Sequence, residues 1–81
     1  MKCDINRRGR DFIDRILRYH SKKFNRLQRE DFRLVMIEYV IKAALYNFET
    51  FGEAYYVIEE EDTLDGVQIT IVIPRSYVLG C

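Results

Sequence analysis

Tryptophan is missing from this 81-residue sequence, and residues that ligate metals or act as nucleophiles are scarce: it has one histidine and two cysteines. Without more of these side chains, the usual catalytic and metal-binding arrangements cannot be assembled. The sequence also has no phosphate-binding glycine loop. We therefore expect a protein that is not an enzyme, with no catalytic residues, no metal site and no cofactor.

The single histidine and one acidic run need separate consideration. His20 falls on the apolar side of a predicted helix, where a half-buried histidine bonded to a backbone or acidic group is the simplest interpretation. The acidic residues 59–62, followed by Asp65 and Gly66, lack the ligand spacing and the terminal glutamate of a calcium loop. We interpret them as a solvated hairpin tip, with an electrostatic contact to a basic partner as the alternative.

Long hydrophobic runs are also absent. No stretch of about 18 apolar residues could form a transmembrane helix, and residues 1–5 lack the apolar core of a signal peptide. The sequence therefore predicts a cytoplasmic protein with a single domain over residues 1–81 and no membrane contact. In a reducing compartment Cys3 and Cys81 are expected to be free thiols; a disulfide joining the two ends of the chain is the alternative.

The net charge of zero conceals a strong asymmetry along the chain. Residues 1–33 carry eleven lysines and arginines against five acids, whereas residues 34–81 carry two against eight. Arginine outnumbers lysine nine to four, which suits bidentate binding of carboxylates or phosphates. The first third of the chain is therefore where an anionic partner would be bound.

Helical periodicity begins at Phe12, after a possible N-cap at Asp11 and a helix-breaking Gly9. Apolar residues and His20 fall within an arc of about 100°, and basic residues occupy the opposite side. The apolar arc comprises Ile13, Ile16, Leu17, His20, Phe24 and Leu27. Weak helix formers at Ser21 and Asn25 predict that the helix frays or turns near Asn25.

A second helix is predicted to start at Glu30 and Asp31, where acids favour the helix dipole, and to run through the apolar residues 32–51 until Gly52 ends it. It is apolar around most of its circumference, and only Glu38, Lys42 and Glu49 mark a polar strip. Such a helix needs cover on more than one side. We therefore expect self-association, most simply a homodimer.

Two strands follow, over residues 54–59 and 67–73, and Pro74 ends the second. A hairpin loop over about residues 61–66 pairs Ile58 with Ile69 and keeps the apolar residues on one face. Residues 77–79, the N-terminal segment or a second protomer could add an edge strand. The predicted fold class is α+β, with two helices packed on a small antiparallel β-hairpin sheet in the order ααββ.

The basic side of the first helix is the predicted partner-binding site, and we assign to it Arg15, Arg18, Tyr19, Lys22, Arg26 and Arg29. Regularly spaced cations beside an aromatic ring could bind an acidic protein surface, bind nucleic acid, or be only a solvated face. The preferred function is a small regulator, adaptor or inhibitor of the kind found among phage and bacterial accessory proteins. Nucleic-acid binding by the same residues is the alternative.

Overall fold

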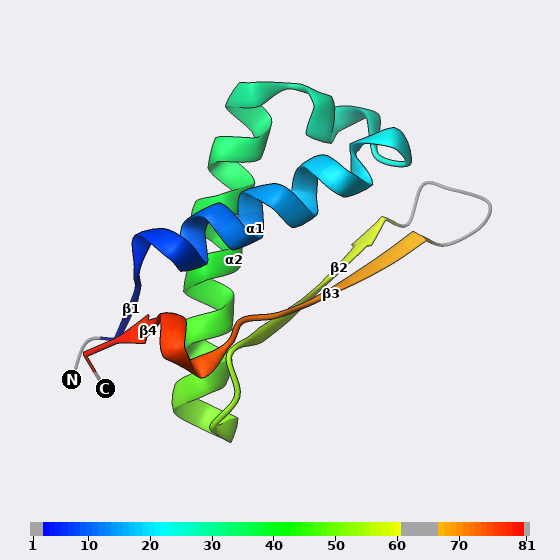
Figure 1. Cartoon of the computed structure of the whole chain (residues 1–81). Coiled ribbons are helices and arrows are strands. Elements are labelled where there is room, and N and C mark those ends of the chain that lie inside the picture. The colour runs from blue at the N-terminus through cyan, green and yellow to red at the C-terminus, as the bar shows by residue number, and fades with distance from the viewer. Residues whose placement is uncertain (1–2, 61–66, 81) are drawn as a thin grey trace.

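The computed structural model describes residues 3–60 and 67–80 and confirms the predicted α+β fold (Figure 1). Two α-helices, a β-hairpin and a short pair of edge strands are joined by turns of 3-10 helix. In chain order these are β1 (Asp4–Ile5), α1 (Arg7–Tyr19), η1 (His20–Lys22), η2 (Asn25–Gln28), α2 (Glu30–Phe51), β2 (Tyr55–Glu60), β3 (Val67–Val72), η3 (Arg75–Tyr77) and β4 (Val78–Leu79).

The first helix begins five residues earlier than an N-cap at Asp11 would allow. Asn6 is the N-cap, and its side-chain oxygen accepts a hydrogen bond of 2.9 Å from the Gly9 amide. Gly9 therefore lies inside α1 and is buried there. A Cβ atom at Gly9 would lie 2.2 Å from Cγ2 of Ile5 and 3.1 Å from Cβ of Tyr77, so the glycine lets β1 and η3 pack directly against the first helical turn.

The first helix also ends earlier than a continuous basic stripe would need. α1 stops at Tyr19, and the chain continues through η1 and η2. The Arg33 guanidinium donates to the carbonyls of Leu27 and Gln28, at 2.9 Å and 3.1 Å, and its Nε lies 3.6 Å from a carboxylate oxygen of Asp14. Arg33 thereby ties η2 to α1 from its position on α2.

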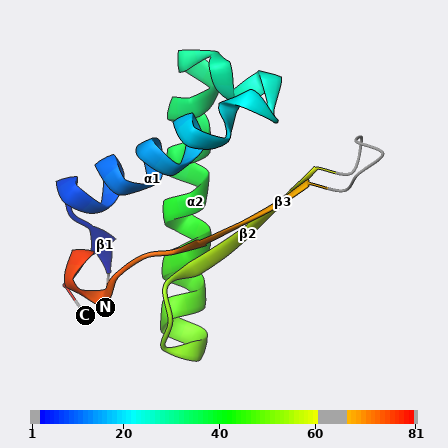
Figure 2. The same cartoon turned by 45° about the vertical axis from the view of Figure 1, so that its right-hand side comes forward.

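The second helix lies at the centre of the molecule, with α1 and the β2–β3 hairpin packed against it (Figure 2). Its buried residues are Ile37, Val40, Ile41 and Ala44. They meet Ile13 and Leu17 of α1, together with Phe24 and Leu27 from the turns, in one apolar core. Gly52 adopts a left-handed conformation with φ of 82° and ends α2, as predicted.

The hairpin has the predicted register: Ile58 pairs with Ile69, and Tyr56 with Ile71. Its loop, residues 61–66, and the acidic tip predicted there lie outside the described residues, apart from the strand residues Glu59 and Glu60. The two segments suggested as a third strand pair with each other, because β1 is antiparallel to β4. Within residues 3–60 and 67–80, the hairpin therefore stays a two-stranded ribbon, and it extends away from α2 (Figure 1).

The expectation of a free thiol at Cys3 is wrong, because this residue is disulfide-bonded. The other cysteine of the chain, Cys81, lies outside the described residues. No helix in the part of the chain described here is both long and apolar enough to span a membrane.

Candidate functional site

The six residues predicted to bind a partner are all exposed, but they do not share one helix face. Arg15, Arg18 and Tyr19 lie on α1, whereas the rest follow the chain around its end. Lys22 lies on η1, Arg26 on η2 and Arg29 just before α2. The predicted straight stripe is thus interrupted where α1 ends.

Two of these cations are already paired with acids of the same chain. Arg18 contacts Asp14 at 2.9 Å, one helical turn away, and Arg29 contacts Asp31 at 2.9 Å. The hydrogen bond that Arg29 donates to the Asp31 carboxylate, together with one donated by the Phe32 amide, lowers the pKa of Asp31 below its usual value. Arg18 and Arg29 are therefore less available to a partner than the sequence indicates.

Three of the six are cations outside these pairs, and together with the neighbouring Lys23 we call them the basic surface: Arg15, Lys22, Lys23 and Arg26. Within the described residues none of the four makes an ion pair. Beside them Tyr19 is 78% exposed, and its ring contacts the His20 ring edge-on, with 5.2 Å between the centroids. His20 is half-buried, as expected, and follows directly on α1.

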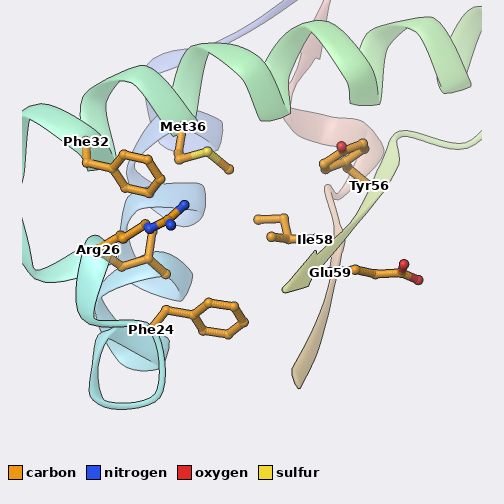
Figure 3. Close-up of a pocket in the computed structure, with 8 residues that line it drawn as sticks. Phe24, Arg26, Phe32, Met36, Tyr56, Ile58 and Glu59 are labelled. Carbon is orange, nitrogen blue, oxygen red and sulfur yellow. The ribbon is translucent and has the colours of Figure 1, made fainter. Parts of the chain in front are cut away.

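Arg26 also borders a cleft between η2, α2 and β2, which the sequence did not predict (Figure 3). The cleft measures about 230 Å³, and its walls are mostly apolar. They are formed by Phe24, Leu27, Phe32, Met36, Tyr56 and Ile58, with Arg26 and Glu59 as the charged residues. In Figure 3 the Arg26 guanidinium reaches into the space between Phe24 and Met36.

The other polar groups of the cleft are bonded within the protein. The Glu59 carboxylate points away from the cleft in Figure 3 and accepts a hydrogen bond of 3.0 Å from Gln68. The Tyr56 hydroxyl donates to the Tyr39 hydroxyl at 3.2 Å, which together with partial burial raises the pKa of Tyr56 to about 12. Of the two charged residues of the cleft, Glu59 is therefore hydrogen-bonded, whereas the Arg26 side chain has no polar partner among the described residues.

The cleft cannot be recognised in the sequence, because its wall residues follow the same apolar pattern as core residues. Phe24 and Leu27 belong to the apolar arc of the predicted first helix, and Ile58 to the apolar face of the hairpin. Only the bend after Tyr19 brings the first two opposite Ile58. No signal in the sequence marks that bend beyond the weak helix formers around it.

Comparison with protein-family models, with curated proteins and with solved structures gave no match. Among the described residues no three His, Cys, Asp or Glu side chains are close enough together to hold a metal ion.

Proposed function

We propose that this protein is a small non-enzymatic interaction protein that binds an acidic segment of another protein. The segment would lie on the basic surface and insert one apolar side chain into the cleft. A single observation carries the proposal: the Arg26 guanidinium reaches into an apolar cleft and has no polar partner in the described residues.

The size of the cleft supports a side chain as its occupant. Pockets that bind small molecules and cofactors usually measure about 300–1,000 Å³, and this cleft, at about 230 Å³, is smaller. A charged group next to apolar walls is stabilised when an opposite charge replaces its lost water. A carboxylate next to the inserted apolar side chain meets that requirement.

The neighbouring cations extend the same preference along the partner. Arg15, Lys22 and Lys23 are exposed and unpaired in the described part of the chain. They would attract an acidic segment from solution and speed association more than they strengthen the final complex. Arg26 and the cleft would then determine which segment binds tightly.

Selection of random peptides on the immobilised protein tests the proposal. We expect enriched peptides to carry a large apolar residue flanked by aspartate or glutamate. Arg26→Gln should weaken a selected peptide about tenfold or more, since a charge-assisted hydrogen bond contributes about 1.5–3 kcal/mol. Arg7→Gln is the matched control, because Arg7 is exposed on α1 and does not line the cleft.

Two results would contradict the proposal. One is enrichment of peptides without acidic residues. The other is an unchanged dissociation constant for Arg26→Gln, measured by fluorescence anisotropy.

Nucleic-acid binding is the second candidate, favoured by a separate hollow on the basic side. Arg18, Tyr19, His20, Lys22 and Lys23 line it, so three cations surround two rings. Cations bind phosphates and exposed rings stack on bases. Titration with single-stranded and duplex oligonucleotides at two salt concentrations tests this candidate, and the absence of binding at low salt would exclude it.

A cytoplasmic location stays a prediction. The disulfide at Cys3 argues against it, because disulfides rarely persist in a reducing cytoplasm.

A further inference from the structure

Four exposed residues of α2 line up on the side of the helix away from the core. Val35, Tyr39, Lys42 and Tyr46 follow one another at intervals of four, three and four residues, which places them on one line along a helix. Val35 and Tyr46 are each 67% exposed, and Tyr39 is 54% exposed. We call these four residues the outer face of α2.

Most of this face is left uncovered by the rest of the described chain, although the hydroxyl and the ring of Tyr39 contact Tyr56 of β2. The buried residues of α2, such as Val40 and Ala44, lie on the opposite side of the helix. In Figure 2, α1 leaves α2 toward one side and the β2–β3 hairpin leaves it toward the other. Large apolar side chains gathered on one exposed line usually mark an interaction site.

The spacing of the four residues decides how two such faces could meet. In a parallel pair each residue meets its own counterpart, so two Lys42 ammonium groups would repel each other within the contact. In an antiparallel pair with a two-fold axis between positions 40 and 41, Tyr39 meets Lys42 of the second copy. The same axis sets Val35 against Tyr46, so each apolar side chain meets another large side chain.

Charge also favours the antiparallel arrangement. Lys42 of one copy would lie over the Tyr39 ring of the other and close to its Glu38, two neighbours that attract a cation. Glu38 is exposed and already accepts a hydrogen bond from Arg10, which leaves its second carboxylate oxygen available. The face is thus complementary to itself in charge and in shape.

We propose that a second copy of this chain binds the outer face of α2 through its own outer face, with the two helices antiparallel. The contact is short, because residues 35–46 span about 17 Å of helix. Stable interfaces bury about 800 Å² per partner, so we expect a weak dimer that dissociates on dilution. None of the four residues lines the cleft, so this proposal stands independently of the proposed function.

Sedimentation equilibrium over a concentration series tests the dimer. The average mass of the wild-type chain should rise from 9.8 kDa toward twice that value. Tyr46→Gln should weaken association about tenfold or more, because it removes a ring that would be central in the contact. Phe51→Gln is the matched control: Phe51 is also 67% exposed and lies on α2, but it falls outside the outer face.

A charge exchange tests the orientation. Lys42→Glu alone should weaken self-association, because the new carboxylate would face Glu38 of the second copy. Mixing Lys42→Glu with Glu38→Lys should restore a heterodimer, since each new charge then meets its opposite. Circular dichroism checks that every variant keeps its fold.

A wild-type chain that stays at 9.8 kDa at every concentration overturns the proposal. Equal effects of Tyr46→Gln and Phe51→Gln also overturn it. If the mixture of charge variants fails to associate while the wild type does, the antiparallel arrangement is wrong.

Discussion

Replacing Gly9 with alanine is expected to destabilise the protein, although alanine is the better helix former. In an exposed helix this change stabilises by about 1 kcal/mol. At Gly9 the added Cβ would lie 2.2 Å from Cγ2 of Ile5 and 3.1 Å from Cβ of Tyr77. Two carbon atoms without a bond between them prefer about 3.5–4.0 Å, so Ile5 would have to move by more than about 1 Å.

The cost of that movement can be worked from the position of Ile5. This side chain is 3% exposed, and its burial contributes about 1.5–3 kcal/mol. Overpacking of this kind typically costs about 1–3 kcal/mol. After subtraction of the helical gain of about 1 kcal/mol, we expect a net loss of up to about 2 kcal/mol, which corresponds to a fall in Tm of up to roughly 15 °C for a chain of this size.

A double-mutant cycle separates the steric conflict between Ile5 and a Cβ at position 9 from any other effect of Gly9→Ala. Ile5→Ala alone should cost about 2–5 kcal/mol. In that background Gly9→Ala should be neutral or stabilising, because the conflicting Cγ2 atom is gone. Thermal and urea unfolding followed by circular dichroism give the four free energies of unfolding.

A comparison with Gly52 controls for the loss of a glycine as such. A Cβ at Gly52 meets nothing within 4 Å, and its φ of +82° is the reason for glycine there. Gly52→Ala should therefore cost about 1 kcal/mol through backbone strain, whatever occupies position 5. A raised Tm for Gly9→Ala would refute the close packing of β1 against α1, as would an equal effect of Gly9→Ala with and without Ile5→Ala.

Three further predictions follow from single contacts. Arg33→Met should lower the free energy of unfolding by about 2 kcal/mol, because the two η2 carbonyls lose their charged donor. Arg15 is exposed, so Arg15→Met is the control and should change the free energy by less than about 0.5 kcal/mol. Urea unfolding measures both. Cys3→Ser should lower the Tm only under oxidising conditions, because Cys3 is disulfide-bonded; equal Tm values with and without reductant in the parent would contradict this. The folded-state pKa of Tyr56 is raised from about 10 to about 12, so its contribution to stability is complete below pH 10 and is lost as the pH rises toward 12. Tyr39→Phe removes the hydrogen-bond partner and should move the phenolate absorbance transition of Tyr56 to lower pH. An unchanged transition would show that the hydrogen bond does not cause the shift in pKa.

The elements that were predicted correctly are those determined by local pattern. The β-branched and aromatic residues of β2 and β3 alternate with a period of two, and only the observed register puts Ile58 and Ile69 on one face. α2 was predicted correctly from its acidic first turn, Glu30 and Asp31, to its end before Gly52, where the chain adopts a positive φ. Both signals depend only on residues that are near neighbours in the sequence or in the hairpin.

The errors arise where distant residues decide the structure. Gly9 looks like a helix breaker unless Ile5 and Tyr77 are known to pack against it. After α1 stops at Tyr19, η2 is held by Arg33 of α2, whose guanidinium donates to the carbonyls of Leu27 and Gln28. Neither contact leaves a periodic signal, and the cleft that depends on the second one was therefore missed.

The pairing of β1 with β4 bears on how this protein could be joined to others. Asp4 lies opposite Leu79, and paired strands are about 5 Å apart. A sequence attached before Asp4 and one attached after Leu79 would therefore leave the protein side by side, at the end remote from Glu60 and Val67 (Figure 1). A domain whose two attachment points are close together can be inserted into a surface loop of a carrier protein without separating the ends of that loop. Inserted in this way, it would be held by the carrier protein only at the β1–β4 end.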